Sequence, residues 1–142
     1  MKLYRKIKIT GSKKFVNQTV KALKLIKIKS QKDFVKINRF LKKIKFSKSS
    51  GMILDKAQFN VGKLTAFSSL EWYASCIVHD VHHYYLHHII KFRWKKGNYT
   101  KHERLCTNEQ LRFLRKIKAD KKLIKHCQDI FKIKYWTKKV WW

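Results

Sequence analysis

The chain has 142 residues, of which 44% are hydrophobic and 14% aromatic, and its 36 lysines and arginines against eight acidic residues give a formal net charge of +28. This length suits one domain with one moderate core, and the aromatic content excludes a disordered basic tail. The charge is typical of proteins that contact polyanions, but only six of the basic residues are arginine, the residue that most often makes bidentate phosphate contacts.

The first third of the chain predicts one strand followed by two helices. The stretch YRKIKIT alternates apolar and basic residues up to Gly11, which predicts a short, edge-like strand. Apolar residues at three- and four-residue spacing follow, with Ser12 in position to cap a helix. A second amphipathic helix follows Ser30, which forms a capping-box pattern with Asp33. These elements make up a predicted N-terminal part over residues 4–44.

The middle of the chain is nearly neutral and predicts a small β-structure followed by a long helix. Alternating residues over 45–68, with two glycines as turn formers, predict two or three short strands in a hairpin or meander. Ser68 or Ser69 is in position to cap a helix that we expect to cover residues 70–92.

Two further helices are predicted after a Gly-Asn turn. The first covers residues 100–118, and Thr100 with Glu103 forms a second capping-box pattern at its start. The last region, 120–142, predicts an amphipathic helix and an aromatic tail. This order of elements predicts one compact α+β domain over residues 1–142, with helices packed on a small sheet or hairpin.

The cysteines and the apolar runs restrict the class of protein further. Cys76, Cys106 and Cys127 contain no CxxC pair, so neither a disulfide framework nor a cysteine zinc ribbon is indicated, and a reducing compartment is favoured. The N-terminus shows no apolar run of a secretory signal, so we expect a cytoplasmic protein. The most apolar run, 76–90, contains Asp80 and five histidines, which excludes a membrane span.

The stretch WYASCIVHDVHHYYLHH holds five of the seven histidines and has helical periodicity. At about 100° per residue, His79 and His83 share one stripe of the helix, with Asp80 beside His83. This is the geometry of the HExxH zinc motif, in which two histidines one turn apart bind the ion and the acidic residue faces the attacking water. The competing interpretation is a buried pair of imidazoles that bond to backbone carbonyls or to Asp80.

Glu103 is the candidate third ligand. It follows His83 by 20 residues, beyond a turn, at the place from which gluzincin-type zinc enzymes take a glutamate ligand, and it shares the inner face of its helix with Cys106. As a capping-box residue, Glu103 would instead accept a hydrogen bond from a backbone N–H group at the start of its own helix. His87, one further turn along, and Glu109, at the flank of the apolar face, are the alternative ligands.

Four blocks of the chain, KIKIT, SGMILDKAQFNVG, LEWYASCIVHDVHH and HERLCTNEQLRFLRKI, fall within roughly residues 6–118. The last two carry an HDxxH helix and then a helix of Glu-x-x-Cys form. Together the blocks resemble a family of small bacterial proteins with a zincin-like, gluzincin-type metallopeptidase core. The matching residues are Trp72, Ala74, His79, Asp80, His83, Glu103 and Cys106. The resemblance implies a compact zincin-like fold in which the strand before the metal-site helix binds an extended peptide.

These residues predict a zinc-dependent, metallopeptidase-like hydrolase of peptide or amide bonds. Zn²⁺ held by His79, His83 and Glu103 would keep a fourth position for water, with Asp80 as general base. Asp80 is one methylene shorter than the usual glutamate, so its carboxylate lies about an ångström farther away, which can cost on the order of a hundredfold in rate. Weak hydrolysis and a purely metal-binding role are both compatible with this shorter side chain. Further groups that can supply transition-state hydrogen bonds are Tyr73, His82 and His87.

A basic, non-enzymatic protein that binds nucleic acid or another polyanion is the alternative function, because aromatic residues interleaved with lysine can stack on bases. These aromatics are Trp94, Tyr135, Trp136, Trp141 and Trp142. The competing interpretation is that the terminal YWTKKVWW docks its aromatics on the domain.

A lesser alternative is an HNH-like nuclease, suggested by a histidine pair followed by Asn98 and His102. Such sites place the histidine pair on a strand, whereas this stretch has helical periodicity.

Overall fold

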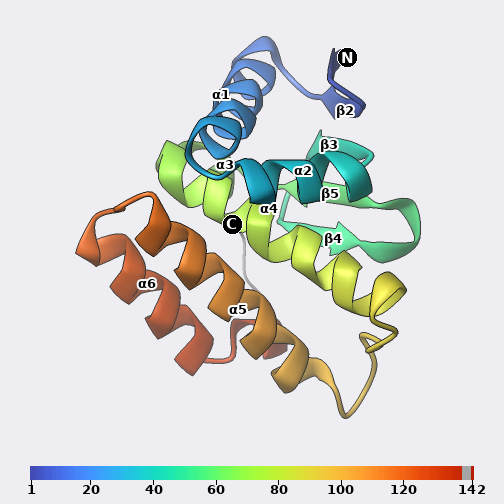
Figure 1. Ribbon diagram of the computed structural model, residues 1–142, viewed down its shortest axis with the longest axis vertical. Helices are drawn as coiled ribbons and strands as arrows, with labels where there is room; N and C mark the ends of the chain where they lie inside the picture. The colour runs from blue at the N-terminus through green and yellow to red at the C-terminus, as the bar shows by residue number, and fades with distance from the viewer. Residues whose placement is uncertain (139–141) are drawn as a thin grey trace.

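The computed structural model describes residues 1–138 and 142, and these residues form six α-helices and a five-stranded mixed sheet (Figure 1). The α+β class predicted from the sequence is confirmed. Residues 139–141, which belong to the predicted element 120–142 and include Trp141, lie outside the described residues. Within the described part of the chain, no helix combines the length and the apolar character that crossing a bilayer requires.

The sheet combines parallel and antiparallel pairs in the order β1-β2-β3-β5-β4. Its strands are β1 (Lys2–Tyr4), β2 (Ile7–Thr10), β3 (Lys43–Phe46), β4 (Gly51–Ile53) and β5 (Gln58–Val61). The three central strands are parallel, and each outer strand is antiparallel to its neighbour. Strand β4 therefore forms one edge of the sheet, next to β5.

One face of the sheet is apolar and the other is polar. The paired residues Ile9, Ile44 and Phe59 form a row across β2, β3 and β5, and all three are fully buried. Lys8 and Lys45, which alternate with them, are exposed. This alternation gives each central strand one face for the core and one face for solvent.

The helices enclose the apolar face of the sheet. They are α1 (Lys13–Lys29), α2 (Gln31–Phe40), α3 (Lys63–Phe67), α4 (Leu70–Tyr84), α5 (Tyr99–Lys116) and α6 (Lys121–Lys132), with 3₁₀ turns η1 (Leu54–Lys56) and η3 (Tyr135–Thr137) and the π-helical turn η2 (Tyr85–Ile89). Figure 1 shows α4 at the centre, with α5 and α6 on one side and α1, α2 and the sheet on the other. Because α4 packs against neighbours on several sides, nine of its 15 residues are buried.

The N-terminal part differs from the single edge-like strand that we predicted. The stretch YRKIKIT divides at a tight turn, where Arg5 has a φ of 56°, and β1 folds back on β2. Strand β2 is therefore internal. It also pairs in parallel with β3, and α1 and α2 form the crossover that a parallel pair requires.

The region 45–68 contains the predicted hairpin, formed by β4 and β5 around η1. It is not a meander, because β3 pairs in parallel with β5 and leaves β4 on the outer edge. Helix α3, which the sequence analysis did not predict, connects this hairpin to α4.

The two predicted serine caps are confirmed, whereas the two predicted capping boxes are wrong. Ser12 and Ser69 accept hydrogen bonds from backbone N–H groups in the first turns of α1 and α4. Ser30 makes no such bond, and its hydroxyl donates to the Asp33 carboxylate over 2.5 Å. Helix α5 begins at Tyr99 without a side-chain cap, so Glu103 lies one turn inside it.

Candidate metal centre

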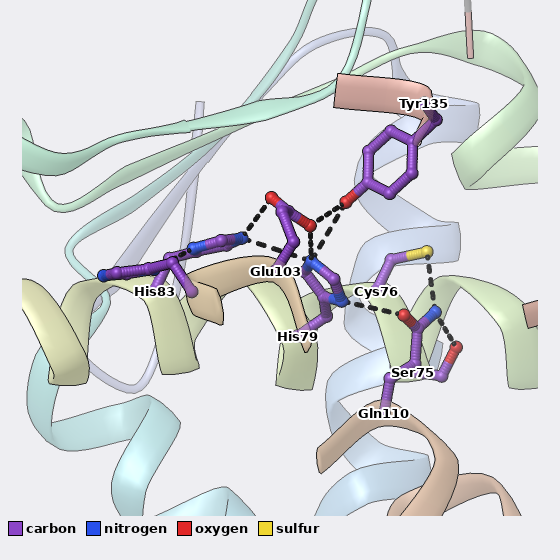
Figure 2. A network of polar contacts seen from close by, with 8 residues as sticks. Ser75, Cys76, His79, His83, Glu103, Gln110 and Tyr135 are labelled. Atoms are coloured by element: carbon purple, nitrogen blue, oxygen red, sulfur yellow. Dashed lines mark hydrogen bonds and ion pairs between the residues drawn. The ribbon is translucent and has the colours of Figure 1, made fainter. Parts of the chain in front are cut away.

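His79, His83 and Glu103 meet between α4 and α5 (Figure 2). The Nε2 atoms of the two histidines lie 3.2 Å apart. Glu103 places one carboxylate oxygen 2.8 Å from His83 Nε2 and the other 3.2 Å from His79 Nε2. All three side chains are buried. The structure thus brings together the three residues that we predicted as metal ligands.

A hydrogen-bond chain fixes the tautomer of His79. Ser75 donates to the backbone carbonyl of Trp72 over 2.7 Å, so its oxygen is free to accept the Gln110 amide N–H over 3.0 Å. This turns the Gln110 carbonyl oxygen towards His79 Nδ1, 2.9 Å away. Because a carbonyl oxygen only accepts, His79 carries its proton on Nδ1, and the lone pair of a neutral ring lies on Nε2.

A second chain fixes His83 in the same way. His102 Nε2 lies 2.9 Å from the backbone carbonyl of Phe92 and must donate to it. His102 Nδ1 is then an acceptor, so His83 Nδ1, 2.7 Å away, donates to it. The lone pair of a neutral His83 is therefore also on Nε2.

The donor set fits a divalent cation. Two nitrogen lone pairs and a carboxylate that face one another within 3.2 Å repel unless a proton or a metal cation lies between them. Zinc takes nitrogen and carboxylate oxygen at about 2.0–2.2 Å in tetrahedral geometry, which places ligand atoms about 3.3 Å from one another. The separations of 2.8–3.2 Å in this site are close to that value.

The charges of these groups are set by one another. Burial opposes ionisation of Glu103, but the hydrogen bonds and charges of the two histidines hold its pKa well below its usual range. Burial lowers the pKa of His79, yet the hydrogen bond and charge of Glu103 outweigh burial and raise it overall. Burial and the neighbouring His83 lower the pKa of His102 to about 4. Glu103 is therefore a carboxylate and His102 is neutral at neutral pH.

Cys106 is a second potential third ligand. Its sulfur and one nitrogen each of His79 and His83 lie within 4.8 Å of one another. The Glu103 oxygens lie 2.8 Å from His83 Nε2 and 3.2 Å from His79 Nε2. In addition, burial raises the pKa of the Cys106 thiol well above its usual value, and metals bind the thiolate. The geometry and the charge therefore both favour Glu103.

Asp80 lines the same cavity as the two histidines. It is partly exposed there, and no side chain or backbone group among the described residues forms a hydrogen bond with its carboxylate. Burial raises the pKa of Asp80 against the opposing charges of His79 and His83. The carboxylate is thus free to accept a proton from a water in the cavity.

Tyr135 is, like His102 and Gln110, a residue whose role in the site the sequence did not predict. Its hydroxyl lies 2.5 Å from Glu103 Oε2 and 3.2 Å from His79 Nε2 (Figure 2). Burial, followed by the charges of Glu103 and Asp80, raises the pKa of Tyr135 well above its usual value, so the hydroxyl remains a donor. In the sequence, Tyr135 was named only among aromatic residues that could stack on bases or dock on the domain.

The cavity in front of these groups has a volume of about 290 Å³. His79, Asp80, His83 and Glu103 are among its lining residues. The edge strand β4 contributes Met52 to its lining, and the C-terminal segment contributes Trp136 and Trp142. The cavity therefore offers apolar surface beside a polar cluster, which is the usual composition of a ligand site.

The remaining candidate residues lie outside the cluster. His82 faces α2, where Lys36 Nζ lies 2.6 Å from its Nδ1. Glu109 binds Arg112 over 2.8 Å on that same side, so it is not placed to be the third ligand. His87 Nδ1 accepts the backbone N–H of Trp94 over 2.9 Å, which occupies the lone pair on that nitrogen.

Two other sequence hypotheses are also resolved by position. Tyr73 is fully buried, and its hydroxyl lies 2.7 Å from Thr19 Oγ1 in the core, so it cannot reach the cluster. The histidine pair at 82 and 83 lies within α4 and not on the strand that an HNH-like site requires. Asn98, the residue invoked with that pair, donates to the backbone carbonyl of Arg93.

Replacing His102 with alanine is expected to weaken zinc binding roughly 10- to 100-fold, which is the usual effect of losing a residue that orients a metal-binding histidine. The physical reason is that His83 Nδ1 loses its only side-chain acceptor. Zinc affinity is measured by competition with a chromophoric chelator. His126→Ala is the matched control, because His126 is exposed on α6 and is in neither group of described residues that could hold a metal ion. Equal affinities of the two variants would show that His102 does not orient a ligand.

Comparison with protein-family models, with curated proteins and with solved structures gives no significant match to this chain. The resemblance to zincin-like metallopeptidases rests on the sequence motifs and stays a prediction.

Proposed function

We propose that the protein is a zinc-dependent hydrolase of peptide or amide bonds, with His79, His83 and Glu103 as the metal ligands. The observation that carries this proposal is the pair of hydrogen-bond chains that turn the Nε2 lone pairs of both histidines towards one carboxylate. A buried structural histidine needs a single satisfied hydrogen bond at each nitrogen. Here, three acceptors instead converge on one point, as in a metal site.

The chain supplies further groups that hydrolysis needs. His79, His83 and Glu103 would hold the Zn²⁺ ion, which would supply Lewis acidity towards a substrate carbonyl and would lower the pKa of water. Asp80, whose carboxylate lines the cavity, accepts the proton of the attacking water. Tyr135 offers a hydroxyl donor beside the ligands, where the carbonyl oxygen of the substrate gains negative charge.

The edge strand β4 is the element that would hold the substrate. It lines the cavity through Gly51 and Met52, and β5 covers only one of its two hydrogen-bonding sides. An extended peptide can add to such a free edge through main-chain hydrogen bonds. This placement brings the peptide backbone past the histidine cluster, in agreement with what the family resemblance implies.

Removal of the metal tests the proposal. The purified protein is treated with a chelator, reloaded with one equivalent of zinc, and incubated with a mixture of peptides whose cleavage is followed by mass spectrometry. We expect zinc to bind in a 1:1 ratio, and we expect cleavage that disappears on chelation and returns with zinc. A protein that binds no zinc contradicts the whole proposal, whereas zinc binding without cleavage leaves a metal-binding protein and contradicts the hydrolase.

A further inference from the structure

Two rows of paired residues cross the face of the sheet that is turned away from the core. The strand register places Lys8, Lys43, Gln58 and Ile53 in the first row, and Thr10, Lys45, Asn60 and Gly51 in the second. Each of these residues is exposed or partly exposed. We call the two rows together the outer face.

The lysines of the outer face repel one another. Lys8 and Lys43 are direct partners on neighbouring strands, which lie about 4.8 Å apart, and like charges in this position are destabilising. Lys45 lies on the same side of β3, about 6.6 Å beyond Lys43. The strands contain no acidic residue, and no ion pair among the described residues involves these lysines. A bound anion would therefore relieve a repulsion within the sheet.

Both rows change from cationic to neutral in the same direction. In the first row, the lysines of β2 and β3 are followed by Gln58 and then by the apolar Ile53. In the second row, Lys45 is followed by Asn60 and then by Gly51, where a Cβ would have no neighbour within 4 Å. Gln58 Nε2 donates to Asn60 Oδ1 over 2.7 Å, and this bond does not use the Gln58 carbonyl oxygen or the Asn60 amide N–H groups. The outer face thus has a cationic column beside a column of amides.

We propose that the outer face binds single-stranded nucleic acid that runs along the strands. The phosphates lie over Lys8, Lys43 and Lys45, and the base edges lie over Gln58 and Asn60. This inference goes beyond the proposed function and does not depend on it, because the histidine cluster lies on the other side of the sheet, where the inward-facing residues of β4 and β5 line the cavity.

The chemistry of a nucleotide follows the order of groups in a row. The phosphate is the anionic end, which lysine contacts, and the base has polar edges that asparagine and glutamine read through hydrogen bonds. Ile53, beyond Gln58, adds an apolar surface on which a base can pack. An anionic lipid surface would use the lysines but not the amides, so the composition of the outer face favours nucleic acid.

The distance between the rows favours a single strand over a duplex. Equivalent residues of the two rows are about 6.6 Å apart along a strand. This is roughly twice the 3.4 Å per nucleotide of a stacked strand. One nucleotide per row therefore requires an extended chain with splayed bases, which is the form in which proteins read single strands.

The first experiment removes two cations of the outer face. Lys43→Gln with Lys45→Gln is compared with Lys21→Gln with Lys24→Gln, a matched control that removes the same charge from exposed positions of α1. Binding of a fluorescent ten-nucleotide single strand to the full chain is measured by anisotropy at several salt concentrations. We expect the slope of log affinity against log salt to become shallower by about 1.4 in the outer-face variant, about 0.7 for each lost phosphate contact, and to stay at the wild-type value in the control. Equal slopes in the two variants, or no binding by the wild type, overturn the proposal.

A single substitution covers the case in which the outer-face double variant does not fold. Lys8→Gln removes one cation of the same column, so we expect the slope to become shallower by about 0.7. A wild-type slope in Lys8→Gln would then overturn the assignment of the phosphates to this column.

The last experiment tests the amides and the class of ligand. Affinities are compared for single strands of adenosine, of cytidine and of uridine, and Asn60→Ala is expected to lose the preference of the wild type while keeping its salt slope. Wild-type preferences in Asn60→Ala overturn the reading of bases by the amides. Tighter binding of a duplex than of its separate strands, or binding only to vesicles that contain phosphatidylserine, overturns the choice of single-stranded nucleic acid. Binding of either the RNA or the DNA form of the single strand supports it.

Discussion

Replacing His79 with alanine is expected to lower zinc affinity by more than roughly 100-fold. Loss of a residue that only orients a metal ligand already lowers affinity by up to about that factor. The reason is that His79 is held in one tautomer by Gln110 and contributes one of the three proposed metal ligands. Affinity is measured by chelator competition, and metal content by elemental analysis of the purified protein. His126→Ala, which changes an exposed histidine of α6, is expected to retain the wild-type value, because His126 is in neither group of described residues that could hold a metal ion.

The same assay identifies the third ligand. Glu103→Ala removes the carboxylate that contacts both histidines, and we expect it to lose zinc as His79→Ala does. Cys106→Ala removes the nearby thiol and is expected to bind zinc as the wild type does. If Cys106→Ala loses zinc and Glu103→Ala retains it, Cys106 is the third ligand in place of Glu103. Full zinc content in both His79→Ala and Glu103→Ala would contradict the metal centre.

Changing Asp80 to asparagine is expected to reduce kcat/KM for peptide cleavage by roughly 10²- to 10⁴-fold, the usual contribution of a general base. Asparagine keeps the size of the side chain and removes its ability to accept a proton from water. Zinc content is expected to be unchanged, because Asp80 is not among the groups that contact the two Nε2 atoms. Cleavage is measured with the best peptide from the metal-removal experiment.

The longer variant Asp80→Glu provides the complementary result. The additional methylene carries the carboxylate about an ångström farther into the cavity, and we expect kcat/KM to rise by up to roughly 100-fold. Unchanged cleavage in both Asp80 variants would mean that another group takes the proton. Loss of zinc from Asp80→Asn would instead make Asp80 a ligand, which the geometry does not favour.

Local patterns in the sequence were sufficient to predict α4 and the residues on its inner stripe. The spacing of His79 and His83 depends only on helical periodicity, so it survives in the folded protein. Helix α4 nevertheless ends at Tyr84 and continues as a π-helical turn, whereas we predicted an α-helix up to residue 92. No periodicity of side chains distinguishes a π-helical turn from another helical turn at this length.

Glu103 shows where local patterns are ambiguous. The Thr100-x-x-Glu103 spacing fits both a helix cap and a ligand that faces α4, and only the start of α5 at Tyr99 decides between them. The structure removes the capping interpretation because Glu103 contacts His79 and His83 across the helix pair. A tertiary contact thus overrides a local motif.

Tyr135 and His102 could not be predicted, because their roles depend on contacts between distant parts of the chain. His102 acts through His83 and the Phe92 carbonyl, and Tyr135 reaches the cluster only because the segment after α6 folds back. No spacing rule connects such residues. The polyanion-binding alternative, which rests on the net charge and on aromatic residues interleaved with lysine, likewise stays a prediction.

Helices α4 and α5 together supply the three proposed metal ligands, and this arrangement affects the order of folding. His79 and Ser75 come from α4, and Glu103, His102 and Gln110 come from α5, so all lie within one contiguous helix-loop-helix segment. Its ligands and their orienting groups therefore assemble when a single short loop closes, which carries a small entropic cost and favours early formation. Only Tyr135 needs the rest of the chain, and we expect it to join the cluster last.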